Sequence, residues 1–250
     1  GNGGFGVATR INNAGQIVGY STVSIPGPYH GTLWNSGNKM DLGTLGFSGN
    51  FAYSQALGIG ENGEVTGFAY AVLQGPEHGM LVTDRGGQDI TPMEQFGLAQ
   101  WHNVNSSGIL GGYISSSQTA GEFRPATYDR TSGDNNGYTL VPLIDGLQGG
   151  YGYDIDDAGR LVGVMFYLDA DPTLSIFKAF VSLNGETSDL NDLATGLPGI
   201  MTEAVDVSGA GHIVGTADGE FGPVAVLLTP GRACEADFNQ DQTVSVQDIF

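Results

Sequence analysis

The chain has few basic residues and a single cysteine, and these two features limit the partners and the covalent cross-links that it can have. Lys and Arg together number 8 against 27 Asp and Glu, so the formal net charge is −19. A surface this acidic repels phosphate backbones and anionic lipid, so we expect no nucleic-acid partner. The only cysteine, Cys234, has no second cysteine with which to form a disulfide inside the chain.

Long apolar runs are also lacking. No stretch approaches the roughly 20 apolar residues that a membrane-spanning helix needs, so we expect no membrane span. The first residues, GNGGFG, have neither the charged start nor the apolar middle of a signal peptide. With only two lysines and an acidic balance, the composition suits a secreted, extracellular or cell-surface protein whose export signal has been removed.

Glycine is abundant instead, at 42 of 250 residues, and its spacing reveals an internal repeat. A segment of the form Gly-x-apolar-x-Gly occurs five times, and an apolar residue stands four positions before each copy. The first glycines are separated by 48, 45, 51 and 52 residues, so one unit has been copied five times. The five copies are Gly15–Gly19, Gly63–Gly67, Gly108–Gly112, Gly159–Gly163 and Gly211–Gly215.

Each copy has the pattern of a β-hairpin followed by further strands. In the first copy, Asn12 to Gly15 supplies a turn-forming Asn and a glycine that can adopt positive φ, and a second strand follows at Gln16 to Tyr20. An alternating third strand is expected at His30 to Trp34, His78 to Val82, Arg124 to Tyr128, Lys178 to Leu183 and Pro223 to Leu228. A shorter fourth strand is expected at Met40 to Leu45, Gln88 to Met93, Thr139 to Leu143 and Ser188 to Leu193.

Four antiparallel strands in about 45 to 52 residues is the size of a propeller blade. The predicted fold is therefore all-β, a five-bladed β-propeller over residues 1–231, with a linear β-solenoid or a two-sheet sandwich as the alternatives. Helical repeats are not expected, because no window has a period of 3.6 across ten residues. The blades are expected at about 1–48, 49–93, 94–145, 146–197 and 198–231.

The fifth copy lacks its fourth strand. After Leu228 the chain continues as Thr-Pro-Gly-Arg and leaves the repeat. We expect the missing strand to come from residues upstream of Gly1, which would close the ring. The alternative is that another chain supplies the strand, because an open sheet edge is a template for strand addition, and head-to-tail donation would give a polymer.

The repeat resembles the HAF repeats of extracellular bacterial proteins. The matching segments are Ala8 to Asn12, Gly15 to Tyr20, His30 to Trp34 and Asp41 to Gly43, and the likeness extends over roughly residues 1–230. Later copies keep the spacing but have different residues at the matching positions, as at Arg124-Pro125-Ala126. The resemblance implies secretion and a repeat architecture, and it implies no reaction.

The tail, residues 232–250, contains a calcium-loop pattern. Oxygen-bearing residues occupy loop positions 1, 3, 5, 7, 9 and 12, the spacing with which such a loop wraps one Ca²⁺ ion. The predicted ligands are Asp237, Asn239, Asp241, Thr243 through its carbonyl, Ser245 and Asp248. The segment resembles a dockerin type I repeat of planctomycete secreted proteins, although Gln242 replaces the usual glycine and only one loop is present. The alternative is a solvated acidic tail.

The histidines and carboxylates that could act in catalysis occupy positions for which the repeat predicts a structural role. His30 and His78 are equivalent positions in neighbouring copies, so each is expected to serve its own blade. Asp156 stands at the turn position of Asn12, where Asn or Asp bonds its own backbone. The other carboxylates considered as a glycosidase pair are Asp154, Asp157, Asp169, Asp171 and Asp206. No nucleophile elbow or phosphate-binding loop has its required context.

Sugar binding by aromatic side chains is the main alternative to a purely structural function. Aromatic residues that could stack on sugar rings from loops are Tyr29, Tyr70, Tyr151, Tyr167 and Trp101, and Trp34 is expected between blades. The prediction is a non-catalytic extracellular surface, adhesion or assembly module, not an enzyme, with a protein partner or a second copy at an open blade edge. The alternative is a carbohydrate-binding, lectin-like propeller or a glycan-active enzyme.

Overall fold

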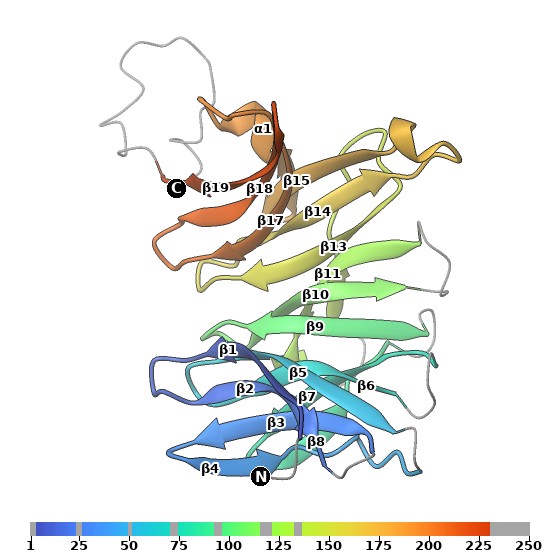
Figure 1. The fold of residues 1–250 in the computed structure, drawn as a ribbon, viewed down its shortest axis with the longest axis vertical. Coiled ribbons are helices and arrows are strands. Elements are labelled where there is room, and N and C mark those ends of the chain that lie inside the picture. The colour runs from blue at the N-terminus through green and yellow to red at the C-terminus, as the bar shows by residue number, and fades with distance from the viewer. Residues whose placement is uncertain are drawn as a thin grey trace. The chain divides into compact units, whose positions relative to one another are not determined.

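The computed structural model describes residues 4–23, 27–49, 52–70, 75–92, 97–115, 122–132 and 137–230. These residues form five antiparallel sheets, A to E in chain order, of which A to D have four strands (Figure 1). In every sheet each strand pairs with the strand next to it in sequence. The all-β prediction is confirmed, and the repeated unit is one antiparallel sheet.

The strand boundaries follow the repeat. Sheet A contains β1 (Gly6–Ile11), β2 (Ile17–Thr22), β3 (Tyr29–Asn35) and β4 (Asn38–Asp41). Sheet B contains β5 (Tyr53–Ile59), β6 (Val65–Tyr70), β7 (His78–Thr83) and β8 (Gly86–Asp89). Sheet C contains β9 (Leu98–Val104), β10 (Ile109–Ser115), β11 (Phe123–Asp129) and β12 (Tyr138–Leu140). Sheet D contains β13 (Gly149–Ile155), β14 (Leu161–Tyr167), β15 (Ile176–Leu183) and β16 (Glu186–Asp189), and sheet E contains β17 (Ile200–Val207), β18 (Ile213–Gly219) and β19 (Gly222–Leu228).

Helical structure in the described residues is confined to three short turns. They are the 3-10 turns η1 (Arg130–Ser132) and η2 (Pro172–Leu174) and the helix α1 (Leu190–Leu193). None of these helices has the length and hydropathy that a membrane crossing needs. The chain divides between Leu140 and Val141 into two compact units, one with sheets A to C and the other with sheets D and E.

The two glycines of the repeated segment have different roles. The first has φ between 75° and 85° in all five copies, as the turn requires. The second lies opposite a β-bulge in the first strand of its sheet, as Gly163 does beside Tyr153. A Cβ on Gly163 would overlap the carbonyl oxygen of Tyr151, and the second glycine of every other copy meets a carbonyl in the same way. The bulge residues are Thr9, Leu57, His102, Tyr153 and Val205.

The fourth strands were predicted too late in the sequence. β4 begins at Asn38 and not at Met40, and β16 ends where α1 begins, so the predicted strand at 188–193 is partly helical. The cause is a two-residue hairpin turn with positive φ at both positions, Ser36 and Gly37 in sheet A and Asn184 and Gly185 in sheet D. This turn type matches the twist of the strands and returns the chain at once.

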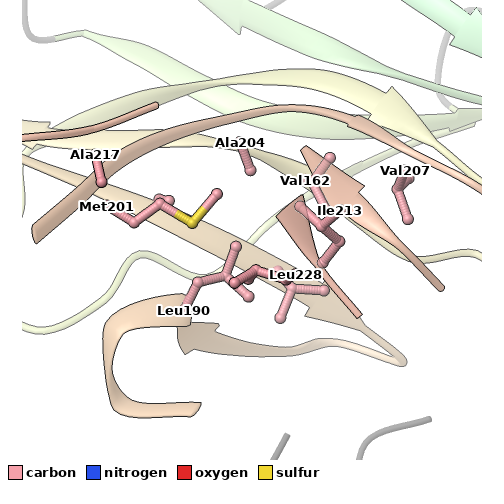
Figure 2. Packing of buried hydrophobic residues seen from close by; sticks show 10 residues of the cluster. Val162, Leu190, Met201, Ala204, Val207, Ile213, Ala217 and Leu228 are labelled. Carbon is pink, nitrogen blue, oxygen red and sulfur yellow. The ribbon is translucent and has the colours of Figure 1, made fainter. Parts of the chain in front are cut away.

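Within each unit, neighbouring sheets pack face to face through apolar side chains. The first strand of the following sheet lies across the second and third strands of the preceding one, as β17 does on β14 and β15. Figure 2 shows the core between sheets D and E, where Val162 and Leu190 meet Met201 and Ile213. Similar cores join A to B and B to C.

The sheets at the two ends of the repeat each have one apolar face that is exposed among the described residues. In sheet A, Ile11 is 62% exposed, whereas its repeat counterpart Ile59 is 4% exposed beneath sheet A. In sheet E, Leu227 is 59% exposed, whereas its counterpart Val181 in sheet D is 3% exposed beneath sheet E. Trp34, expected between blades, is half-buried and lies over Gly6 of its own sheet.

Sheet E also has one strand fewer than the others. Its order is β17-β18-β19, so among the described residues no strand pairs with the outer edge of β19. The predicted three-strand fifth unit is therefore confirmed for the described residues.

Candidate functional site

The predicted calcium ligands lie outside the described residues. Asp237, Asn239, Asp241, Thr243, Ser245 and Asp248 all fall within 231–250. Nowhere in the described ranges do three or more His, Cys, Asp or Glu side chains gather closely enough to hold a metal ion. The calcium loop therefore stays a prediction from the sequence.

The two repeat-equivalent histidines each bond within their own sheet, as the repeat predicts. His30 Nδ1 lies 3.0 Å from both carboxylate oxygens of Asp41, and His78 Nδ1 lies 2.8 Å from Asp89 Oδ2. The basic residue is the first or second residue of the third strand, and the acidic residue ends the fourth. We call such a pair a clasp, because it joins the third and fourth strands of one sheet.

Sheet D has the same clasp with a lysine. Lys178 Nζ lies 2.7 Å from Asp189 Oδ2, and hydrogen bonding to Asp189 raises the pKa of Lys178. Asp189 Oδ1 also accepts a hydrogen bond of 2.9 Å from the backbone N–H of Asn191 and so caps α1. Sheet C has Leu140 at the acidic position and sheet E has Val224 at the basic position, so neither sequence can form a clasp.

The acidic and amide residues at the hairpin turns bind the backbone, as predicted. The N–H of Arg160 donates to Asp156 Oδ1 at 2.9 Å, and that of Gln16 donates to Asn12 Oδ1 at 3.0 Å. Ser208 accepts the equivalent bond from His212 at 3.1 Å. Asp156 also pairs with the Arg160 guanidinium at 2.5 Å in a buried ion pair. These groups hold turns, and their oxygens are occupied by the fold.

The remaining candidate carboxylates bond to the backbone or lie exposed. Asp154 Oδ2 accepts the backbone N–H of Val207 at 2.9 Å and so joins sheet D to sheet E. Asp169 and Asp171 accept backbone N–H groups within the loop before β15, and the Thr173 hydroxyl and N–H lower the pKa of Asp171. Asp157 is exposed in the turn after β13, and Asp206 is exposed on β17.

The aromatic residues proposed as loop platforms lie in strands. Tyr29 and Tyr70 are the end residues of β3 and β6, their hydroxyl oxygens are 3.4 Å apart, and both rings pack against Tyr53. Tyr151 lies within β13 and contacts Phe166, and Tyr167 ends β14. Trp101 is fully buried in β9 above Gly79, so it is not a loop residue exposed to a sugar, as the lectin-like alternative required. Alternation with the fully buried Ala99 was the signal for its position.

The described residues also form a polar cleft between sheets B and C. Its volume is about 970 Å³, and it lies beside the ion pair in which Arg130 Nη1 approaches Glu64 Oε1 at 2.5 Å. Arg85, Gln88 and Asp89 line it from the β7–β8 hairpin. Hydrogen-bond donors and acceptors line the cleft together with acidic and basic side chains, which suits a polar ligand with several hydroxyls.

Two of the bulge residues carry perturbed acid–base groups. Burial lowers the pKa of His102 to about 4, and the positive charge of Arg10 acts in the same direction. Burial raises the pKa of Tyr153 to about 12, with further contributions from Glu203 and Tyr151. The fold therefore keeps both side chains neutral near pH 7.

Compared with models of known protein families and with curated protein sequences, the chain matches none of either.

Proposed function

We propose that the chain is a non-catalytic extracellular assembly module, built as a five-bladed β-propeller. Sheet E packs on sheet A to complete the ring, and the edge of β19 accepts a strand from a partner. The resemblance to HAF repeats of extracellular proteins agrees with this location. One observation carries the proposal: among the described residues, sheet E follows the repeat but lacks two neighbours that sheets A, B and D have, a strand at the outer edge and a following sheet packed on the face that contains Val214 and Leu227.

Ring closure is supported by the interfaces that the repeat already makes. Val18 and Leu33 of sheet A are buried against sheet B, and Val162 and Val181 of sheet D are buried against sheet E. Their counterparts in sheet E are Val214 and Leu227, both exposed. Burying such side chains contributes about 1.5–3 kcal/mol each, so an uncovered face of this kind favours a covering sheet.

Sheet A offers the matching surface. The face that sheet B turns toward sheet A contains Ala56, Ile59 and Val65. Sheet A has Ala8, Ile11 and Ile17 at the same positions, and its outward face is the uncovered one. Sheet E on sheet A would thus repeat the contact of A on B.

A cysteine cross-link tests the ring. At the A–B interface the hairpin turns of neighbouring sheets touch, with Asn13 N 3.2 Å from Glu61 Oε2, so the turns at Asn13 and Gly209 become neighbours in a closed ring. We expect Asn13→Cys with Gly209→Cys, in a Cys234→Ser background, to form a disulfide within the monomer under mild oxidation. The matched control is the pair Asn13→Cys and Gly146→Cys, which should not cross-link. Disulfide-linked dimers alone would contradict closure within one chain.

The proposed absence of catalysis is supported by what the candidate groups do. The histidines His30 and His78, the turn residue Asp156 and the inter-sheet residue Asp154 are all engaged in holding the fold. Turnover of a polysaccharide that is lost on Asp154→Asn, in a variant that remains folded, would contradict this part of the proposal.

The cleft between sheets B and C favours carbohydrate binding as a second candidate function. Its lining of Gln88, Asp89 and Arg130 offers donors and acceptors at a size that admits several sugar rings. A glycan array with calcium present tests it. Selective binding that disappears on Gln88→Ala and persists in Gln148→Ala, outside the cleft, would support a lectin-like function.

A further inference from the structure

The outer edge of sheet E differs from the outer edges of the other four sheets. The outer strands β4, β8, β12 and β16 are three or four residues long, and β4 and β16 carry charged side chains. Short, charged strands are the usual protection of a sheet edge. β19 is seven residues long and reads Gly-Pro-Val-Ala-Val-Leu-Leu, with no charged residue. No described residue pairs with its outer edge, and along it only Pro223 lacks an N–H group.

The repeat defines the place that such a strand would take. In sheet A the fourth strand pairs with Thr32 to Asn35, the second half of β3, and in sheet D it pairs with Phe180 to Leu183. The equivalent stretch of sheet E, by its pairing with β18, is Val226 to Thr229. A fourth strand of the observed kind therefore needs only about four residues.

The chain's own continuation is poorly suited to fill that place by a tight hairpin. Pro230 and Gly231 stand where sheet D has Asn184 and Gly185. The turn in sheet D has φ of 54° and 84° at these positions. Proline is locked near φ −65° and cannot adopt the first of these values. The turn by which sheet D reaches its fourth strand is therefore not possible at Pro230.

The sequence after the proline nevertheless keeps the spacing of a fourth strand. Without a gap, Glu235 takes the position of the clasp residues Asp41 and Asp189, and Ala236 takes that of the apolar residue that follows them. We propose that residues 232–236 of one copy pair with the edge of β19 in a second copy. This inference rests on the proposed assembly function and names its donor and acceptor.

A donor variant tests the inference in the full-length chain under reducing conditions. We expect the native chain to show a mass that rises with concentration in sedimentation experiments, and Ala233→Pro to reduce that association at least tenfold. The matched control is Val244→Pro, which places a proline in the same tail outside the donor segment and should associate as the native chain does. Equal association of all three chains would overturn the inference and leave assembly by another surface standing.

An acceptor variant closes the edge from within. Replacing residues 230–238 with the sequence of residues 184–192 supplies the turn and fourth strand of sheet D. This chain should remain monomeric and should not bind a labelled synthetic peptide of residues 231–237, which the Ala233→Pro chain should bind. A native chain that is monomeric at every concentration and binds no peptide would overturn both the inference and the assembly function.

Discussion

Sheets D and E are built on one pattern and differ in what surrounds them. Both have a bulged first strand, a second strand that begins within the Gly-x-apolar-x-Gly segment, and a third strand of seven or eight residues. Sheet D continues into a charged fourth strand and is covered by sheet E, which buries Val162 and Val181. Sheet E keeps apolar residues at the same positions although no described sheet covers them. The repeat thus specifies a face and an edge independently of the neighbour that covers them.

The largest effect should come from placing a side chain on the second glycine of the repeated segment, which in both sheets lies close to a carbonyl oxygen of the first strand. We expect Gly163→Ala in sheet D to cost about 3 kcal/mol in the free energy of unfolding, because its Cβ would overlap the carbonyl of Tyr151. Gly215→Ala should cost as much in sheet E. Gly209→Ala, with no atom within 4 Å of the new Cβ, is the control and should change stability by less than about 0.5 kcal/mol. Denaturant unfolding measures all three.

Two bulge residues, one in each compact unit, should make the free energy of unfolding depend on pH in opposite ranges. His102 in sheet C has a folded pKa of about 4, below its unfolded value, so its stabilising effect is fully present above pH 6.5 and is lost as the pH falls toward 4. The loss should approach about 3 kcal/mol. Tyr153 in sheet D has a raised pKa, so its effect is present below pH 10 and is lost as the pH rises toward 12.

A pair of substitutions checks this assignment. His102→Gln should flatten the acid limb of the unfolding free energy between pH 6.5 and 4, and Tyr153→Phe should flatten the alkaline limb above pH 10. An acid limb that is unchanged in His102→Gln would show that another group titrates there.

The clasp should matter in sheet D and has no counterpart in sheet E. Asp189→Ala removes the partner of Lys178 and the cap of α1, so we expect a loss of about 2 kcal/mol at pH 7. Asp218→Ala, an exposed carboxylate of sheet E, should change stability by less than about 0.5 kcal/mol. Similar costs for the two changes would refute the structural role of the clasp.

The smallest effect belongs to the hairpin turn that sheet E lacks. Gly185→Ala in sheet D forces alanine to adopt φ of 84°, which should cost about 1 kcal/mol. Pro230→Asn in sheet E permits the same turn, and in our account it lets the tail pair within its own chain. Chemical denaturation measures the first change, and loss of concentration-dependent mass measures the second.

Much of the fold could be predicted from the sequence because glycine marks the turns. The first glycine of each segment needs positive φ, so its position set the hairpins correctly. The bulges could not be predicted. The second glycine is required because a carbonyl oxygen of the neighbouring strand lies close to it, and that contact is known only once the two strands are paired. The displaced fourth strands were predictable in sheet D, where Asn184-Gly185 is a hairpin signal.

The site was predictable only where the repeat supplied a reference. Equivalence of His30 and His78 predicted bonds within each sheet, and the clasps confirm it. The partners Asp41 and Asp89, eleven residues later, could have been found from the same equivalence. The polar cleft joins residues of two sheets, and no local pattern in the sequence marks it.

The central claim, that sheet E is covered as sheet D is, can be measured with one pair of variants. Val181→Asp and Leu227→Asp place the same charge at the same repeat position, on a face that is buried in sheet D and open in sheet E. If sheet E packs on sheet A in the native protein, both should lower the free energy of unfolding by about 3 kcal/mol or more. A cost below about 0.5 kcal/mol for Leu227→Asp, the value of a surface change, would contradict the closed ring.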